Sequence, residues 1–71
     1  MEKEEWRKKI GEQVRQRRES LGMTQSALSQ RTGLDRANIS KIEGGRYNVS
    51  IDILSRIAVA LKCEIKLEPE E

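Results

Sequence analysis

The sequence has few of the residues that carry out most enzyme chemistry and bind most metals. It contains no histidine and no phenylalanine, one cysteine (Cys63), and two aromatic residues, Trp6 and Tyr47. Without histidine, the chain lacks the usual proton shuttle and the commonest metal ligand. One cysteine can form neither an internal disulfide nor a cysteine zinc site. We therefore expect no catalytic residues, no metal and no cofactor, and two aromatics are too few for a single-strand stacking platform.

Long apolar stretches are also absent. No run approaches the ~18 consecutive apolar residues of a membrane-spanning helix. The N-terminal MEKEEWRKK is charged, and the apolar stretch that a signal peptide requires does not follow it. One unpaired cysteine suits a reducing compartment. We expect a cytoplasmic protein with no membrane partner, and 71 residues suffice for one small domain.

Charge is distributed unevenly along the chain, although the formal net charge is only +2. Residues 7–46 carry ten basic and four acidic side chains, a net of +6, whereas residues 1–6 and 47–71 each carry −2. A basic middle between acidic ends fits a surface that faces a polyanion. A solvated helix face would give the same pattern, so charge alone leaves both interpretations open.

Apolar spacing and capping residues predict helices through most of the chain, at about 4–21, 25–32, 36–43 and 51–62. The last three follow the potential N-cap residues Thr24, Asp35 and Ser50. Gly22, Gly33 and the pair Gly44-Gly45 stand where helices should end. The two short helices between 25 and 43, joined by a tight turn, form a helix-turn-helix unit. Gly11 has no local explanation, because a mid-helix glycine costs roughly 1 kcal/mol.

The last apolar residues follow a period of two. Cys63, Ile65 and Leu67 alternate with charged residues, which predicts a strand over 63–68 that ends before Pro69. A lone strand in a helical chain has no partner for its backbone groups. We therefore expect it to pair with the same strand of a second copy across a two-fold axis. The alternative is that this segment frays or continues the preceding helix for a turn.

Several motifs occur together in register between Ile10 and Leu61. They are Arg18, Gly22-Met23-Thr24-Gln25, Leu28, Gly33, Ile39 and Ile42-Glu43-Gly44-Gly45. With these motifs the sequence resembles the Cro and lambda-repressor type of helix-turn-helix, also called the xenobiotic-response-element family. The resemblance implies an all-α, lambda-repressor-like bundle of four to five helices. It also implies binding of double-stranded DNA, with the third helix in the major groove.

The sequence departs from this family in three places. Val49 stands where the family usually has proline, and Ser29 where it usually has alanine. The C-terminal strand replaces the fifth helix of the phage repressors. In this last feature the chain is similar to HipB-type antitoxins, which are repressors that dimerise through such a strand.

The resemblance also implies roles for individual residues. Arg36 is expected to contact base edges, since a bidentate arginine on guanine favours that base over a wrong one by roughly 1–3 kcal/mol. Lys41 could reach a base or a phosphate. Tyr47 could cover the core instead of contacting DNA. The expected base contacts are Arg36, Ala37, Ser40 and Lys41. The expected phosphate contacts are Thr24, Gln25, Asn38, Arg46, Tyr47 and Asn48. Arg18 and Glu43 are expected to form a structural ion pair. Independently of the resemblance, the wide apolar stripe over 51–62 and the C-terminal strand predict a dimer interface of Ile53, Ile57, Ala60, Cys63, Ile65 and Leu67.

The sequence therefore predicts a DNA-binding domain over residues 1–62, a dimerisation strand over 63–68 and an acidic tail over 69–71. The predicted function is a homodimeric repressor that reads a palindromic operator in a bacterial or phage system, associated with the nucleoid through DNA. The alternative is an antitoxin that binds a toxin partner and regulates its own operon. No nucleophile–base pair or phosphate-binding loop supports an enzyme.

Overall fold

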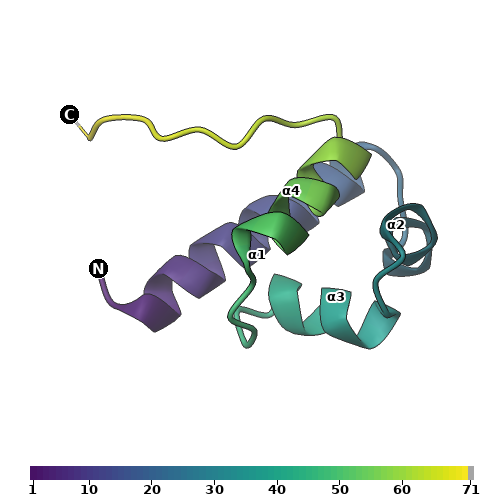
Figure 1. Ribbon diagram of the computed structural model, residues 1–71, viewed down its shortest axis with the longest axis horizontal. Helices are drawn as coiled ribbons and strands as arrows, with labels where there is room; N and C mark the ends of the chain where they lie inside the picture. Colours follow the sequence, from purple (N-terminus) through teal and green to yellow (C-terminus); the bar gives the residue numbers. More distant parts are fainter. Residues whose placement is uncertain (71) are drawn as a thin grey trace.

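The computed structural model describes residues 1–70, which form four α-helices and an extended C-terminal segment (Figure 1). The helices are α1 (Lys3–Ser20), α2 (Gln25–Thr32), α3 (Arg36–Glu43) and α4 (Ile51–Ala60). The predicted all-α helix-turn-helix bundle is confirmed, with four helices in this part of the chain. None of these helices is both long enough and apolar enough to cross a membrane.

Side-chain hydrogen bonds cap the starts of α2 and α4. Thr24 Oγ1 accepts a hydrogen bond from the Ala27 N–H at 3.0 Å, and Ser50 Oγ accepts one from the Ile53 N–H at 3.1 Å. These bonds satisfy backbone donors that a helix start leaves free. Asp35 occupies the same position before α3, but its side chain accepts no such bond. The predicted side-chain cap is wrong there, and the helix starts with backbone bonds to the Asp35 carbonyl alone.

The end of α1 shows why a glycine is needed at position 22. Gly22 has a left-handed backbone with φ +68°, a conformation that costs glycine little. Its N–H donates to the Glu19 carbonyl, and the Met23 N–H donates to the Arg18 carbonyl. This pair of bonds is a Schellman motif, which satisfies the last carbonyls of the helix and turns the chain toward α2.

Gly11 lies at the crossing of α1 and α3. A Cβ atom at this position would stand 2.2 Å from the Ile42 carbonyl oxygen and 2.8 Å from that of Glu43. No side chain fits at that distance from backbone oxygens, so glycine lets α1 and the end of α3 approach closely. This long-range contact explains the mid-helix glycine that the sequence left unexplained.

The hydrophobic core lies where the four helices meet. Its buried apolar side chains are Val14, Leu28, Ile39, Ile42, Ile57 and Leu61. The predicted apolar stripes extend beyond what the core covers. Trp6 on α1 and Ile51 on α4 remain 49% and 64% exposed, because a bundle this small leaves the outer turns of its helices uncovered.

The C-terminal segment does not continue α4. Lys62 adopts φ +56°, and the Cys63 N–H donates to the Ala58 carbonyl, which closes the helix. Residues 63–70 then run back along α1 toward the N-terminus (Figure 1). The predicted strand is absent from the described chain, since residues 64–70 make no backbone hydrogen bond within residues 1–70. The physical reason is that a strand needs a second extended backbone to pair with, and within residues 1–70 the neighbours of this segment are helices.

Candidate nucleic-acid interface

Helix α3 has a buried edge and an accessible edge. Ile39 and Ile42 are 0% and 3% exposed and hold the helix against the core. The side chains expected to contact bases lie on the rest of the helix: Arg36, Ala37 and Lys41 are exposed, and Ser40 is half-buried. The structure thus presents a small, basic helical edge of a size that the major groove admits.

The residues expected to contact phosphates come from three places around α3. Thr24 and Gln25 begin α2, Asn38 lies on α3, and Arg46, Tyr47 and Asn48 form the turn after it. Thr24, Arg46 and Asn48 are exposed, whereas Gln25, Asn38 and Tyr47 are half-buried. The Arg46 N–H donates to the Lys41 carbonyl. This backbone bond holds the turn against the C-terminal end of α3.

Arg18 and Glu43 join α1 to the end of α3. Arg18 Nε donates to Glu43 Oε2 at 2.7 Å and Nη2 donates to Oε1 at 2.9 Å, while Nη1 donates to the Met23 carbonyl at 2.8 Å. Both side chains are nearly buried. Hydrogen bonding to Glu43 raises the pKa of the Arg18 guanidinium although burial opposes the shift. The three hydrogen bonds of Arg18 fix where the end of α3 lies relative to α1.

Gln25 belongs to the same network. Its Nε2 donates to Glu43 Oε1 at 3.1 Å, so the side chain that was expected to bind a phosphate is held by the ion pair. The free backbone N–H groups at the start of α2 lie beside it, and such groups attract anions. This arrangement ties the start of α2 to the end of α3.

Tyr47 lies at the margin of the core. It is half-buried and packs against the core cluster, and it lines a cavity of about 170 Å³ together with Trp6, Ile42 and Leu54. This position fits the alternative role of Tyr47 as a cover for the core. Its neighbours Arg46 and Asn48 are exposed and better placed to reach a ligand in solvent.

Lys8 is a basic residue near this surface that sequence reasoning missed. A Cβ atom built on Gly45 would lie 2.6 Å from Lys8 Cγ, so the stem of Lys8 packs on the turn that follows α3. Lys8 is itself exposed. The only local signal is the basic run Arg7-Lys8-Lys9, which does not indicate which of the three faces α3.

The residues expected at a dimer interface divide into two groups. Ile57 is 1% exposed and belongs to the core of the single chain, so no surface of it is left for a partner. Ile53 and Ala60 are half-buried, and Cys63, Ile65 and Leu67 are exposed. Val59, which the sequence did not single out, is 78% exposed on α4.

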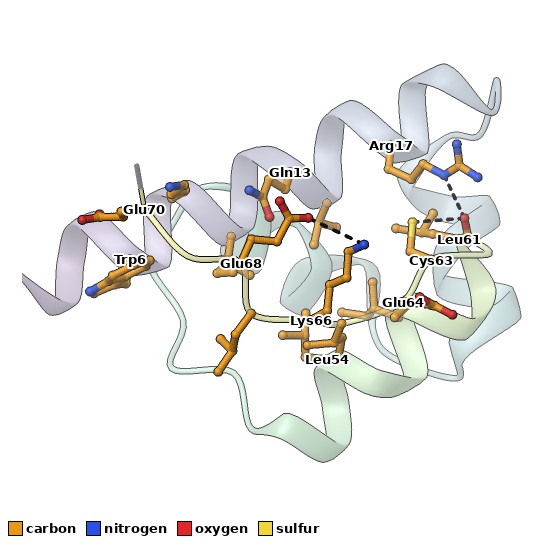
Figure 2. A pocket seen from close by; sticks show the side chains of 17 residues that line it. Trp6, Gln13, Arg17, Leu54, Leu61, Cys63, Glu64, Lys66, Glu68 and Glu70 are labelled. Atoms are coloured by element: carbon orange, nitrogen blue, oxygen red, sulfur yellow. Dashed lines mark hydrogen bonds and ion pairs between the residues drawn. The ribbon is translucent and has the colours of Figure 1, made fainter. Parts of the chain in front are cut away.

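The extended C-terminal segment covers a cavity rather than filling it. The cavity has a volume of about 570 Å³ and lies between α1, α4 and the segment. Figure 2 shows Trp6, Gln13 and Arg17 of α1 on one side, with Leu54 of α4 and Leu61, the residue that follows α4, on the other. Arg17 Nε donates to the Leu61 carbonyl at 2.9 Å and joins the two helices. No group of three or more acidic or cysteine side chains in the described residues could hold a metal ion.

Comparison with known sequences relates the chain to regulators. The model of the helix-turn-helix family HTH_3 matches residues 14–67. An uncharacterized HTH-type transcriptional regulator of Methanothermobacter thermautotrophicus is 44% identical over 48 residues, which are 68% of this chain and 70% of that protein. The ImmF control region 10 kDa protein of Bacillus phage phi105 is 32% identical over 60 residues, covering 84% of this chain and 67% of the phage protein. A regulator of Sinorhizobium fredii is 40% identical over 62 residues, but this chain spans only 32% of its length.

Two solved structures share the fold. The restriction-modification controller protein C.AhdI from Aeromonas hydrophila is 34% identical, with a TM-score of 0.79 over 82% of this chain and 88% of that one. An HTH_3 family transcriptional regulator from Vibrio cholerae is 28% identical, with a TM-score of 0.84 over 89% of this chain and 35% of that one.

Proposed function

The chain belongs to the helix-turn-helix family of DNA-binding transcriptional regulators, and we propose that it is a homodimeric, sequence-specific repressor of a palindromic operator. Members of this family are regulators, not enzymes. The observation that carries the proposal is the division of α3 into an edge locked in the core and an exposed edge bearing Arg36 and Lys41. The similarity to a restriction-modification controller protein supports a regulatory role.

In this proposal α3 enters the major groove and its exposed edge reads bases. Arg36 donates to guanine O6 and N7, Ala37 touches a thymine methyl group, and Lys41 and Ser40 reach the adjacent bases. Arg36 lies in the first turn of the helix, where a helix-turn-helix protein makes its base contacts.

Backbone phosphates are held on both sides of α3. The start of α2, with Thr24 and Gln25, holds one phosphate through its free N–H groups. Asn38 and the turn of Arg46, Tyr47 and Asn48 hold others, and Lys8 adds a further charge beside that turn. Because the Arg18–Glu43 pair connects the two ends of this surface, it keeps the phosphate contacts in register with the base contacts.

One recognition helix makes too few contacts for tight binding, so we propose that two copies act together. A two-fold dimer would place its two α3 helices ~34 Å apart, one turn of DNA, and would read an inverted repeat. The proposed interface contains the accessible apolar residues of α4 and the C-terminal segment: Ile53, Val59, Ala60, Cys63, Ile65 and Leu67. Ile57 is left out because the core already uses it.

Selection of bound duplexes from a random DNA library tests the proposal, with wild type and Arg36→Ala run in parallel. We expect wild type to enrich an inverted repeat, and Arg36→Ala to lose preference at one symmetric position. Arg15→Ala is the matched control, since Arg15 is an exposed arginine of α1 with only a 4.0 Å contact to Glu12. A folded, dimeric protein that enriches no sequence at low salt would contradict the proposal.

A second candidate function is an antitoxin that binds a toxin and regulates its own operon. It is favoured by the exposed apolar side chains Ile65 and Leu67, which are 46% and 98% exposed. The two functions can coexist in one chain. Co-purification of a larger partner encoded beside this gene would support the second function, and a neighbouring region without such a gene would contradict it.

A further inference from the structure

The turn over residues 33–35 joins α2 to α3 and sets the direction in which α3 leaves α2 (Figure 1). Leu34 lies at its centre, and its half-buried side chain packs against the core cluster. The Leu34 N–H and carbonyl make no hydrogen bond to another backbone group within residues 1–70. Backbone groups that are partly withdrawn from water need partners, so side chains have to supply them here.

Two hydroxyl groups of α2 are these partners. Ser29 Oγ donates a hydrogen bond to the Leu34 carbonyl. Thr32 Oγ1 accepts one from the Leu34 N–H at 3.2 Å and itself donates to the Leu28 carbonyl at 2.8 Å. Thr32 is 5% exposed and Ser29 is half-buried, so water competes for these bonds less than at an exposed site. Leu34 is therefore held at its side chain, its N–H and its carbonyl.

Helix α3 begins directly after this turn without a side-chain cap. The Asp35 side chain accepts no hydrogen bond from the start of the helix. The Asn38 and Ile39 N–H groups both donate to the Asp35 carbonyl, at 3.0 and 3.1 Å. The Leu34 carbonyl and the Asp35 nitrogen belong to one planar peptide unit, so holding that carbonyl restricts the residue from which α3 starts. Most helices obtain this restriction from their own N-cap side chain.

We infer that Ser29 and Thr32 are positioning residues for base recognition by α3, because their hydroxyl groups clamp Leu34 and thereby hold the first turn of that helix. Arg36, the proposed base contact, lies two positions after Leu34, so a rotation of the turn moves it relative to the major groove. The clamp also fixes α3 relative to α2, whose start is proposed to hold a phosphate. This inference rests on the proposed function and names the residues that set its geometry.

The clamp is a feature of this chain more than of its family, since Ser29 stands where the family usually has alanine. Ser29→Ala should therefore fold, and alanine is also the better helix former. Ser55→Ala is the matched control, because Ser55 is an exposed serine of α4 whose Oγ donates to the Asp52 carbonyl at 2.8 Å. It loses the same kind of bond away from α3. Thr32→Val removes the second hydroxyl of the clamp, and Thr32→Ser keeps it.

Amide hydrogen exchange measured by NMR tests the clamp without DNA. Ser29→Ala should speed exchange of the Asn38 and Ile39 N–H groups about tenfold, the equivalent of one hydrogen bond. Exchange of the Leu28 N–H, which donates to a carbonyl at the start of α2, should not change. Thr32→Val should have the same local effect and Thr32→Ser should have none. A domain that is merely less stable would speed all amides that exchange through global unfolding, Leu28 included.

Binding to two duplexes tests the positioning role. One is the duplex that wild type enriches from the random library, and the other has a random sequence. Ser29→Ala should bind the enriched duplex about tenfold more weakly and the random duplex as well as wild type does, since phosphate contacts supply non-specific binding. Thr32→Ser and Ser55→Ala should keep the wild-type ratio of the two affinities. A smaller folded fraction lowers both affinities alike, so the ratio reports the geometry of α3 and not stability.

The outcomes separate this inference from the proposed function. Unchanged exchange at Asn38 and Ile39 in Ser29→Ala overturns the clamp and leaves the proposed function standing. Faster exchange with an unchanged ratio of affinities overturns the positioning role, again without affecting the proposed function. A folded wild-type chain that enriches no duplex overturns the proposed function and the positioning role together.

Discussion

Arg18 and Glu43 share two hydrogen bonds, of 2.7 and 2.9 Å, across 25 positions of the sequence. They connect the last turn of α1 to the last residue of α3, and Gln25 joins the same carboxylate from the start of α2. Three elements of the proposed DNA surface thus meet at one carboxylate.

Removing one member of the pair should destabilise the domain strongly. Arg18→Ala leaves the Glu43 carboxylate desolvated without its partner, and we expect a loss of about 3–5 kcal/mol in the free energy of unfolding. Urea denaturation followed by circular dichroism measures it. Arg15→Ala on the same helix should change stability by less than about 0.5 kcal/mol. An equal effect of the two substitutions would show that the buried pair has no special role.

Gly11→Ala should be destabilising, although alanine is usually the better helix residue. The added Cβ would meet the Ile42 carbonyl oxygen at 2.2 Å, so α1 and α3 must separate, at about 2–3 kcal/mol. Thermal unfolding of Gly11→Ala beside Glu12→Ala, an exposed neighbour, measures the difference. A raised melting temperature for Gly11→Ala would refute the close helix crossing.

The two N-cap positions should respond differently to alanine. Thr24→Ala removes a hydrogen bond to the Ala27 N–H, and we expect a loss of about 1 kcal/mol. Asp35→Ala removes no cap bond and should cost clearly less. Chemical denaturation of both variants provides the comparison, and equal losses would mean that Asp35 caps α3 in solution.

Lys8→Ala should weaken DNA binding without changing sequence preference. A phosphate contact adds affinity evenly across sequences, so the slope of log affinity against log salt should become shallower by about 1. Fluorescence anisotropy at several salt concentrations, on specific and random duplexes, measures both quantities. Lys3→Ala, at the first residue of the same helix, is the control. A loss confined to the specific duplex would assign Lys8 to base reading instead.

Much of the fold follows from the sequence because helices and their ends depend on neighbours in the chain. The capping bonds of Thr24 and Ser50 and the left-handed glycines at 22 and 33 involve partners a few residues away. The short helices therefore begin and end where local chemistry predicts. The motifs around Gln25 and Glu43 likewise indicated the family, since they lie within one continuous stretch.

The tertiary structure decided what depends on residues far apart in the chain. The close approach of α1 to α3 explains Gly11, and the packing of Lys8 on Gly45 places Lys8 beside α3. Ile57 is buried in the core of the single chain, so a partner cannot contact it. The period of two in residues 63–68 was visible in the sequence, but a strand forms only where a second backbone supplies hydrogen bonds. Because folding brings no such backbone to this segment, the sequence determined its alternating faces and the tertiary structure left them unpaired.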